Sequence, residues 1–123
     1  MNDQQLARLK AITEELRQIG RDCHDQFLNR TSAADYKVDF FGEVKPYAEH
    51  VTELLKEWQP LAMQWIREAK PRYIFVPQLL DADENLTIVS VTAFQKDTRK
   101  KRFLNTISAI EHTLTTMLDQ LGS

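Results

Sequence analysis

One long amphipathic stretch in the middle of the chain constrains the fold more than any other feature. Between Lys45-Pro46 and Lys70-Pro71, apolar residues recur at steps of three and four, which is typical of one face of a helix. This face carries the following residues: Val51, Leu54, Leu55, Trp58, Leu61, Ala62, Trp65, Ile66 and Ala69. Because an indole buries roughly 150–250 Å², other segments must pack over Trp58 and Trp65.

Three further stretches have helical periodicity. Apolar residues recur at this spacing from Leu6 to Phe27, from Leu79 to Phe94 and from Phe103 to Leu121. The second of them also suits a strand because it is rich in β-branched residues. Four helices with mostly short connections pack most simply as an antiparallel bundle. We therefore expect an all-α antiparallel four-helix bundle that forms a single domain over residues 1–123.

Capping and helix-breaking residues refine this expectation. Pro60 lies inside the long helix, where proline removes a hydrogen bond and costs about 3 kcal/mol. We expect a kink there, or a break into two helices. Asp39 can cap a short extra helix near residues 39–45. Asn2 and Gln5 have the spacing of a capping box.

The connecting segments are predicted from the loss of periodicity. Residues 29–38 are rich in side chains that compete with helix, so they form the main loop. We expect Phe40 and Phe41 to cover the tryptophan face. Residues 73–76 are predicted to be an extended connector whose aromatic side chains dock on the bundle. Asp97 is the expected N-cap of the last helix.

Composition limits the compartment and the partners. Cys23 is the single cysteine, so no internal disulfide can form, and the first residues do not resemble a secretory signal. The apolar runs fall short of the roughly 20 residues that span a bilayer. A net charge of −2 provides no overall field that attracts nucleic acid. We expect a cytoplasmic protein without a membrane segment.

A basic run precedes the last amphipathic stretch. Arg99, Lys100, Lys101 and Arg102 fall at the expected positive end of this helix, where cations are disfavoured. A bound anion would relieve the conflict, so the run is a candidate phosphate or carboxylate site, or a weak nucleic-acid contact. The alternative is that Lys96 and Arg99 lie at the end of the preceding helix and the others pair with acidic residues across the bundle.

A second candidate site is aromatic. Five rings lie near the expected bends of the chain: Phe40, Phe41, Tyr47, Tyr73 and Phe75. They could line a groove for a protein partner, or they could seal the bundle end.

The histidines and the cysteine are not spaced as metal binding or nucleophilic catalysis requires. A di-iron bundle uses Glu-x-x-His on two helices, and none of His24, His50 and His112 has Glu three positions before it. Cys23 falls on an apolar face, and neighbouring helical residues point about 100° apart, so His24 is badly placed to activate it. We expect no catalytic residues, no metal site and no cofactor.

Three segments together resemble a known family. They are Asp39-Phe40-Phe41 with Lys45-Pro46, Lys70-Pro71-Arg72-Tyr73, and Lys100-Lys101-Arg102-Phe103. Their order and spacing are similar to those of the YppE-like family, small bacterial proteins of unknown function found mainly in Gram-positive bacteria. The resemblance extends from about residue 36 to residue 121. It implies an all-helical bundle and transfers no active site.

The sequence thus predicts a non-catalytic helical bundle that acts as a protein-interaction or accessory module. Its partner would be an unidentified protein or a second copy of the chain in a homo-oligomer. The alternative is anion or nucleic-acid binding through Arg99, Lys100, Lys101 and Arg102 at the start of the last helix.

Overall fold

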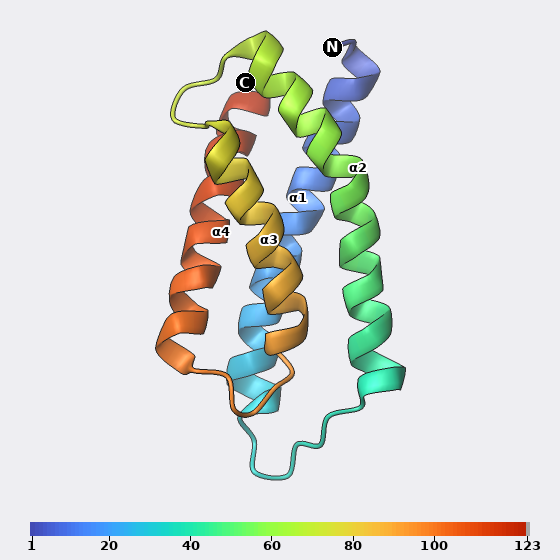
Figure 1. Ribbon diagram of the computed structural model, residues 1–123, viewed down its shortest axis with the longest axis vertical. Coiled ribbons are helices and arrows are strands. Elements are labelled where there is room, and N and C mark those ends of the chain that lie inside the picture. Colours follow the sequence, from blue (N-terminus) through green and yellow to red (C-terminus); the bar gives the residue numbers. More distant parts are fainter. Residues whose placement is uncertain (123) are drawn as a thin grey trace.

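The four long helices run along one axis and are joined at the two ends of the molecule (Figure 1). The computed structural model describes residues 1–122. Its long helices are α1 (Asp3–Asp25), α2 (Lys45–Ala69), α3 (Val76–Thr92) and α4 (Lys100–Leu121). Successive helices run in opposite directions and the described residues contain no strand, which confirms the all-α antiparallel bundle. Within this range no helix is both long enough and apolar enough to cross a bilayer.

Helix α1 begins at the predicted capping box and extends further than expected. The Asn2 side chain accepts a hydrogen bond from the Gln5 N–H at 2.7 Å, and the Gln5 side chain accepts one from the Asn2 N–H at 3.0 Å. A π-helical segment, Gln26–Thr31, prolongs the helical path into the predicted loop. The reason is a buried anchor, because the Thr31 hydroxyl donates to the Ala93 carbonyl at 2.6 Å.

Helix α2 passes through Pro60 without a break and changes direction near its middle (Figure 1). The bend agrees with the expected kink, whereas the alternative of two separate helices does not occur. Pro60 is exposed, so the carbonyl that loses its partner can turn to water. The helix ends at Lys70, whose φ of 46° and ψ of 58° are left-handed, directly before Pro71.

A short helical turn, Phe40–Val44, precedes α2 as predicted. The Asp39 carboxylate caps it by accepting a hydrogen bond from the Gly42 N–H at 2.9 Å. The expectation that Phe40 and Phe41 cover the tryptophans is wrong, because these side chains are 48% and 81% exposed. One turn directs a single side to the bundle, and the buried Val44 occupies that side.

The core closes around the tryptophan face. Trp58 is fully buried and Trp65 is 5% exposed, as predicted. They belong to one continuous cluster that includes buried residues of all four long helices. Because such burial excludes water from both indoles, the second helix organises the bundle as its periodicity indicates.

The connector before α3 is not a strand, but its aromatics do not dock as predicted. Tyr73 and Phe75 are exposed, while Ile74 is buried. The Gln120 side chain fixes this segment, since its amide accepts from the Arg72 N–H and donates to the Arg72 carbonyl, both at 2.7 Å. Ile74 therefore anchors the connector, and the rings on either side of it face solvent.

Candidate functional site

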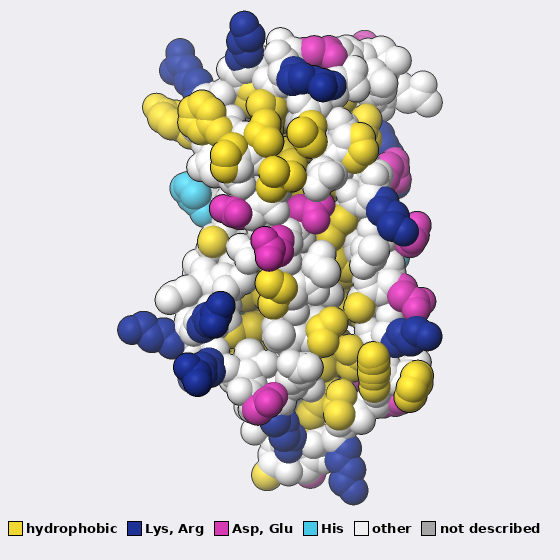
Figure 2. Space-filling view, viewed as in Figure 1, with side chains coloured by type: hydrophobic (Ala, Val, Ile, Leu, Met, Phe, Trp, Pro, Cys, Tyr) yellow, Lys and Arg dark blue, Asp and Glu magenta, His cyan; other side chains and the backbone are white. Residues whose placement is uncertain are grey.

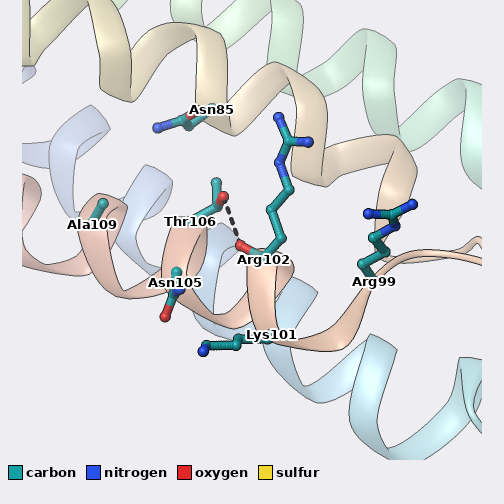
Figure 3. A pocket seen from close by; sticks show the side chains of 7 residues that line it. All are labelled: Asn85, Arg99, Lys101, Arg102, Asn105, Thr106 and Ala109. Carbon is teal, nitrogen blue, oxygen red and sulfur yellow. Dashed lines mark hydrogen bonds between the residues drawn. The ribbon is translucent and has the colours of Figure 1, made fainter.

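An open groove lies between α3 and α4 (Figure 3). It consists of two adjoining hollows of about 490 and 380 Å³. The residues that line both hollows are Asn85, Arg99, Arg102 and Thr106. Lys101 also lines the larger hollow. The groove thus contains three of the four residues of the basic run.

The start of α4 places this basic run at the positive end of a helix. The helix begins at Lys100, so Arg99 is the N-cap and the prediction of Asp97 is wrong. Thr98 belongs to the turn between α3 and α4, and its hydroxyl donates a hydrogen bond to the Thr92 carbonyl at 2.8 Å. The first helical hydrogen bond joins the Phe103 N–H to the Arg99 carbonyl at 3.0 Å. Three preceding N–H groups therefore lack an acceptor within the helix.

The basic side chains are not neutralised by the protein. Within residues 1–122, none of Arg99, Lys100, Lys101 and Arg102 forms an ion pair or donates a side-chain hydrogen bond. The alternative of pairing across the bundle is therefore wrong. Lys96 instead donates to the carbonyls of Ala33 and Ala34, at 2.9 and 3.2 Å, in the loop after α1. The basic run remains available to an external anion.

The side chains of the groove point in different directions. Arg102 extends from α4 toward α3, whereas Asn105 extends away from α3 and Lys101 runs to the side (Figure 3). The Thr106 hydroxyl donates to the Arg102 carbonyl at 3.0 Å and is thereby engaged within α4. The polar groups of the groove thus include the Arg102 guanidinium and the Asn85 amide, together with the exposed Gln95 and Asp97 of the smaller hollow. The guanidinium matches the geometry of a carboxylate.

Apolar and acidic residues of α3 complete this face. Ile88 lines the smaller hollow and is 46% exposed, while Phe103, which lines the same hollow, is buried. Asp81 and Glu84 are exposed and form no ion pair in the described part of the chain. Figure 2 shows acidic side chains gathered near the middle of this face and basic side chains toward its lower left, although Asp97 lines the same hollow as Arg99 and Arg102.

The predicted aromatic site is divided between the two ends of the bundle. Phe40 and Phe41 precede α2 and stack edge to face, with ring centroids 5.2 Å apart. Tyr73 and Phe75 follow α2, so the 25 residues of this helix separate the two pairs. Tyr47 packs into the bundle against Phe94, with ring centroids 5.7 Å apart. The five rings do not form one groove.

The histidines and the cysteine are dispersed. His50 Nε2 lies 3.5 Å from Glu15 on α1, while His24 Nδ1 lies 3.4 Å from Asp25. No three metal-ligating side chains cluster anywhere in residues 1–122. Cys23 is 1% exposed, as its place on the apolar face predicts. Burial raises its pKa to about 12, although a contact with the Tyr47 hydroxyl at 3.8 Å opposes the shift.

The α3 side of the groove was not predicted from the sequence. Asn85 and Ile88 lie off the buried stripe of α3, and periodicity does not say which exposed strip borders a neighbouring helix. The one sequence feature that could have indicated the groove was Ile88, a large apolar residue on the exposed side of its helix.

Comparisons with known proteins place this geometry in a family. The chain matches the bacterial domain of unknown function DUF1798 over residues 13–121. It is 23% identical over 114 residues to the uncharacterized protein YppE of Bacillus subtilis, covering 93% of this chain and 92% of YppE. These matches confirm the resemblance inferred from the three motifs.

Solved structures show the same fold. A protein of unknown function from Listeria innocua has a TM-score of 0.89 at 25% identity, over 96% of this chain and 94% of that one. The crystal structure of YppE from Bacillus subtilis has a TM-score of 0.88 at 23% identity, over 99% and 96%. A DUF1798 domain from Staphylococcus aureus has a TM-score of 0.82 at 25% identity, over 92% and 95%.

Proposed function

Because this chain belongs to DUF1798, a family of bacterial proteins of unknown function, we propose its role from its own geometry. It is a non-catalytic interaction module whose α3–α4 groove binds an acidic segment of a protein partner. The observation that carries the proposal is the basic run without internal partners beside an exposed isoleucine.

The groove has a net positive charge, since three basic side chains and the single carboxylate of Asp97 line it, and this charge favours an acidic ligand. Arg99 and Arg102 line both hollows, and guanidinium groups form two parallel hydrogen bonds with a carboxylate. The N–H groups at the start of α4 add positive potential at the same place. Because a single exposed ion pair contributes only about 0.2–1 kcal/mol, binding requires several such contacts at once.

The apolar part of the groove favours a protein segment over a free anion. Ile88 offers exposed apolar surface next to Arg102, so an occupant with one apolar side chain and flanking carboxylates gains both kinds of contact. Hollows of this size fall within the roughly 300–1,000 Å³ typical of ligand sites. A helical or extended peptide segment meets these requirements.

Nucleic acid is a poorer match to the same surface. The chain has a net charge of −2, and the exposed Asp81 and Glu84 lie on the same helix as the groove-lining Asn85. A continuous polyphosphate lying along this face would approach these carboxylates, and like charges repel it. A short acidic segment can avoid them.

The proposed role includes neither catalysis nor a secreted location. The raised pKa of Cys23 keeps this thiol protonated at neutral pH, which removes its value as a nucleophile. The same unpaired cysteine supports a reducing compartment, and we therefore place the protein in the cytoplasm.

Fluorescence anisotropy with a synthetic peptide tests the proposal. The labelled peptide carries Glu at every fourth position around one central Leu, and labelled oligonucleotides of similar length serve as competing probes. We expect the wild-type protein to bind the peptide at low salt, and the double variant Arg99→Gln/Arg102→Gln to bind it about tenfold more weakly.

A matched control separates the groove from overall charge. Lys37 and Arg67 are exposed and lie outside the groove, so Lys37→Gln/Arg67→Gln removes the same charge and should retain binding. Equal losses in both double variants, or tighter binding of the oligonucleotides than of the peptide, would reject the proposal.

A further inference from the structure

The exposed strip of α3 carries an acidic end and an apolar centre. Asp81, Glu84 and Ile88 are separated by three and four residues, which places them on one side of the helix. All three are exposed, and neither carboxylate has an ion-pair partner in the part of the chain that the structure describes. This strip has the chemistry that the groove requires of its occupant.

The exposed strip of α3 and the basic run lie on the same face but at different positions along the bundle axis. Seven residues separate Asp81 from Ile88, which corresponds to about 10.5 Å along the helix. The helices α3 and α4 are antiparallel, so Arg99 and Arg102 lie near the end of α3 that is remote from Asp81. Along the face the order is therefore acidic, apolar and net basic, because Arg99, Lys101 and Arg102 outnumber Asp97 at the last position.

Such an order is complementary to itself under a two-fold rotation. In a symmetric dimer, a residue that contacts a second residue across the interface is matched by the reverse contact. An axis near Ile88 would bring the acidic end of each copy to the basic end of the other, and would bring the two isoleucines together. The contact between acidic and basic ends would then form twice, once on each side of the axis.

We propose that the occupant of the α3–α4 groove is the α3 helix of a second copy of this chain, in a two-fold symmetric dimer. This inference rests on the proposed function, because the second copy supplies the acidic segment. The contacts are exposed charge pairs around a small apolar centre, so association is weak and decreases as salt screens the pairs. A free acidic peptide would compete with the dimer for the same groove.

Sedimentation equilibrium with charge-reversed variants tests the dimer. At high protein concentration and low salt, the wild-type mass should rise from 14.4 kDa toward twice that value. The variants Arg99→Glu/Arg102→Glu and Asp81→Lys/Glu84→Lys should each remain monomeric, because the paired charges at the two ends of either homodimer become like charges. An equimolar mixture should associate, because both end contacts of the mixed dimer join opposite charges.

The mixing experiment shows whether the variants fail to dimerise because like charges repel or because the variants are misfolded. A misfolded variant could not recover association on mixing, and circular dichroism checks that each variant keeps its helices. Lys37→Glu/Arg67→Glu changes the net charge as much as Arg99→Glu/Arg102→Glu and should leave the dimer intact. A wild-type protein that stays monomeric, or variants that fail to associate when mixed, would overturn the inference.

A second readout keeps the two proposals apart. Asp81→Lys/Glu84→Lys retains the basic groove, so it should bind the acidic peptide at least as tightly as the wild-type protein does. Peptide binding without any dimer would leave the proposed function standing and refute the second-copy occupant. A dimer that recovers on mixing while the peptide fails to bind would retain the second copy and reject an external acidic partner.

Discussion

The indole N–H of Trp58 donates a hydrogen bond to the hydroxyl of Thr13 at 3.0 Å in the centre of the bundle. Both residues are fully buried, and the Thr13 hydroxyl donates in turn to the Leu9 carbonyl at 2.7 Å. The one polar atom of the largest buried side chain is thereby satisfied, which a tightly packed core requires. This hydrogen bond joins α2 to α1 inside the core.

Replacing Thr13 by valine should destabilise the protein although the shape of the side chain is kept. The Trp58 N–H would remain buried without an acceptor, at a cost of about 1–3 kcal/mol. Urea denaturation measures this loss, and Thr13→Ser should retain most of the hydrogen bond. In a Trp58→Phe background the same Thr13→Val change should cost clearly less, and an undiminished cost would show that the pair is not coupled.

Replacing Arg99 by serine should stabilise α4 while weakening binding at the groove. Arg99 is the N-cap and has an extended backbone, but its side chain makes no capping hydrogen bond. Serine accepts from the N–H groups of the first turn, and such a cap is worth about 1 kcal/mol relative to alanine. Thermal unfolding of Arg99→Ser and Arg99→Ala measures the difference. A less stable Arg99→Ser would mean that the arginine makes stabilising contacts within the chain.

Alkaline pH should unfold the protein through Cys23 and Tyr47. Burial raises the pKa of Cys23 from 9.0 to about 12 and also raises the pKa of Tyr47 above its ordinary value. The unfolded chain therefore loses its thiol proton near pH 9.0, whereas the folded chain holds it to about pH 12. The stability due to this group is complete below pH 9.0 and is lost as the pH rises to about 12.

Denaturation over a series of alkaline pH values checks this prediction. Cys23→Ala should show a shallower decline of the free energy of unfolding, because one of the two titrating groups is gone. An Ellman's reagent assay gives an independent reading, since native Cys23 should react only as fast as the protein opens. Rapid modification of the native thiol would contradict the burial.

Replacing Gly42 by alanine should remove the cap of the short turn before α2. A Cβ atom at this position would collide with the Asp39 carboxylate, which accepts the Gly42 N–H hydrogen bond. The carboxylate must rotate away, so we expect a loss of roughly 0.5–2 kcal/mol, as for other N-caps. Asp39→Ala should cost a similar amount, and the double variant should cost little more than either one. Fully additive losses would show that the two residues act separately.

The helices could be predicted from the sequence because burial imposes a period on their apolar residues. The tryptophan face of α2, the proline bend and the capping box of α1 all follow from local rules. The connectors could not be predicted in the same way. Ile74 is buried, although Tyr73 and Phe75 on either side of it are exposed. One buried side chain is enough to anchor a short connector. The path of the backbone, and not the size of the side chain, decides which residue is buried.

Only the basic run of the α3–α4 groove could be predicted from the sequence, for a similar reason. The basic run contradicts the helix dipole, so it was visible in the sequence as a local conflict. Its neighbours Asn85 and Ile88 come from another helix, and the sequence alone does not specify the rotation of α3 that places them at the groove. Thr13 was missed because a threonine on an apolar stripe resembles an ordinary packing residue.

Nuclear magnetic resonance tests the assignment of the α3–α4 groove most directly. The acidic peptide is titrated into Asp81→Lys/Glu84→Lys, labelled with nitrogen-15, and backbone amide shifts are followed. The groove predicts that the largest changes fall at residues 85–88 of α3 and 99–106 of α4, and that they disappear with Arg99→Gln/Arg102→Gln. Changes centred on Phe40 and Phe41, or no saturable change, would contradict it.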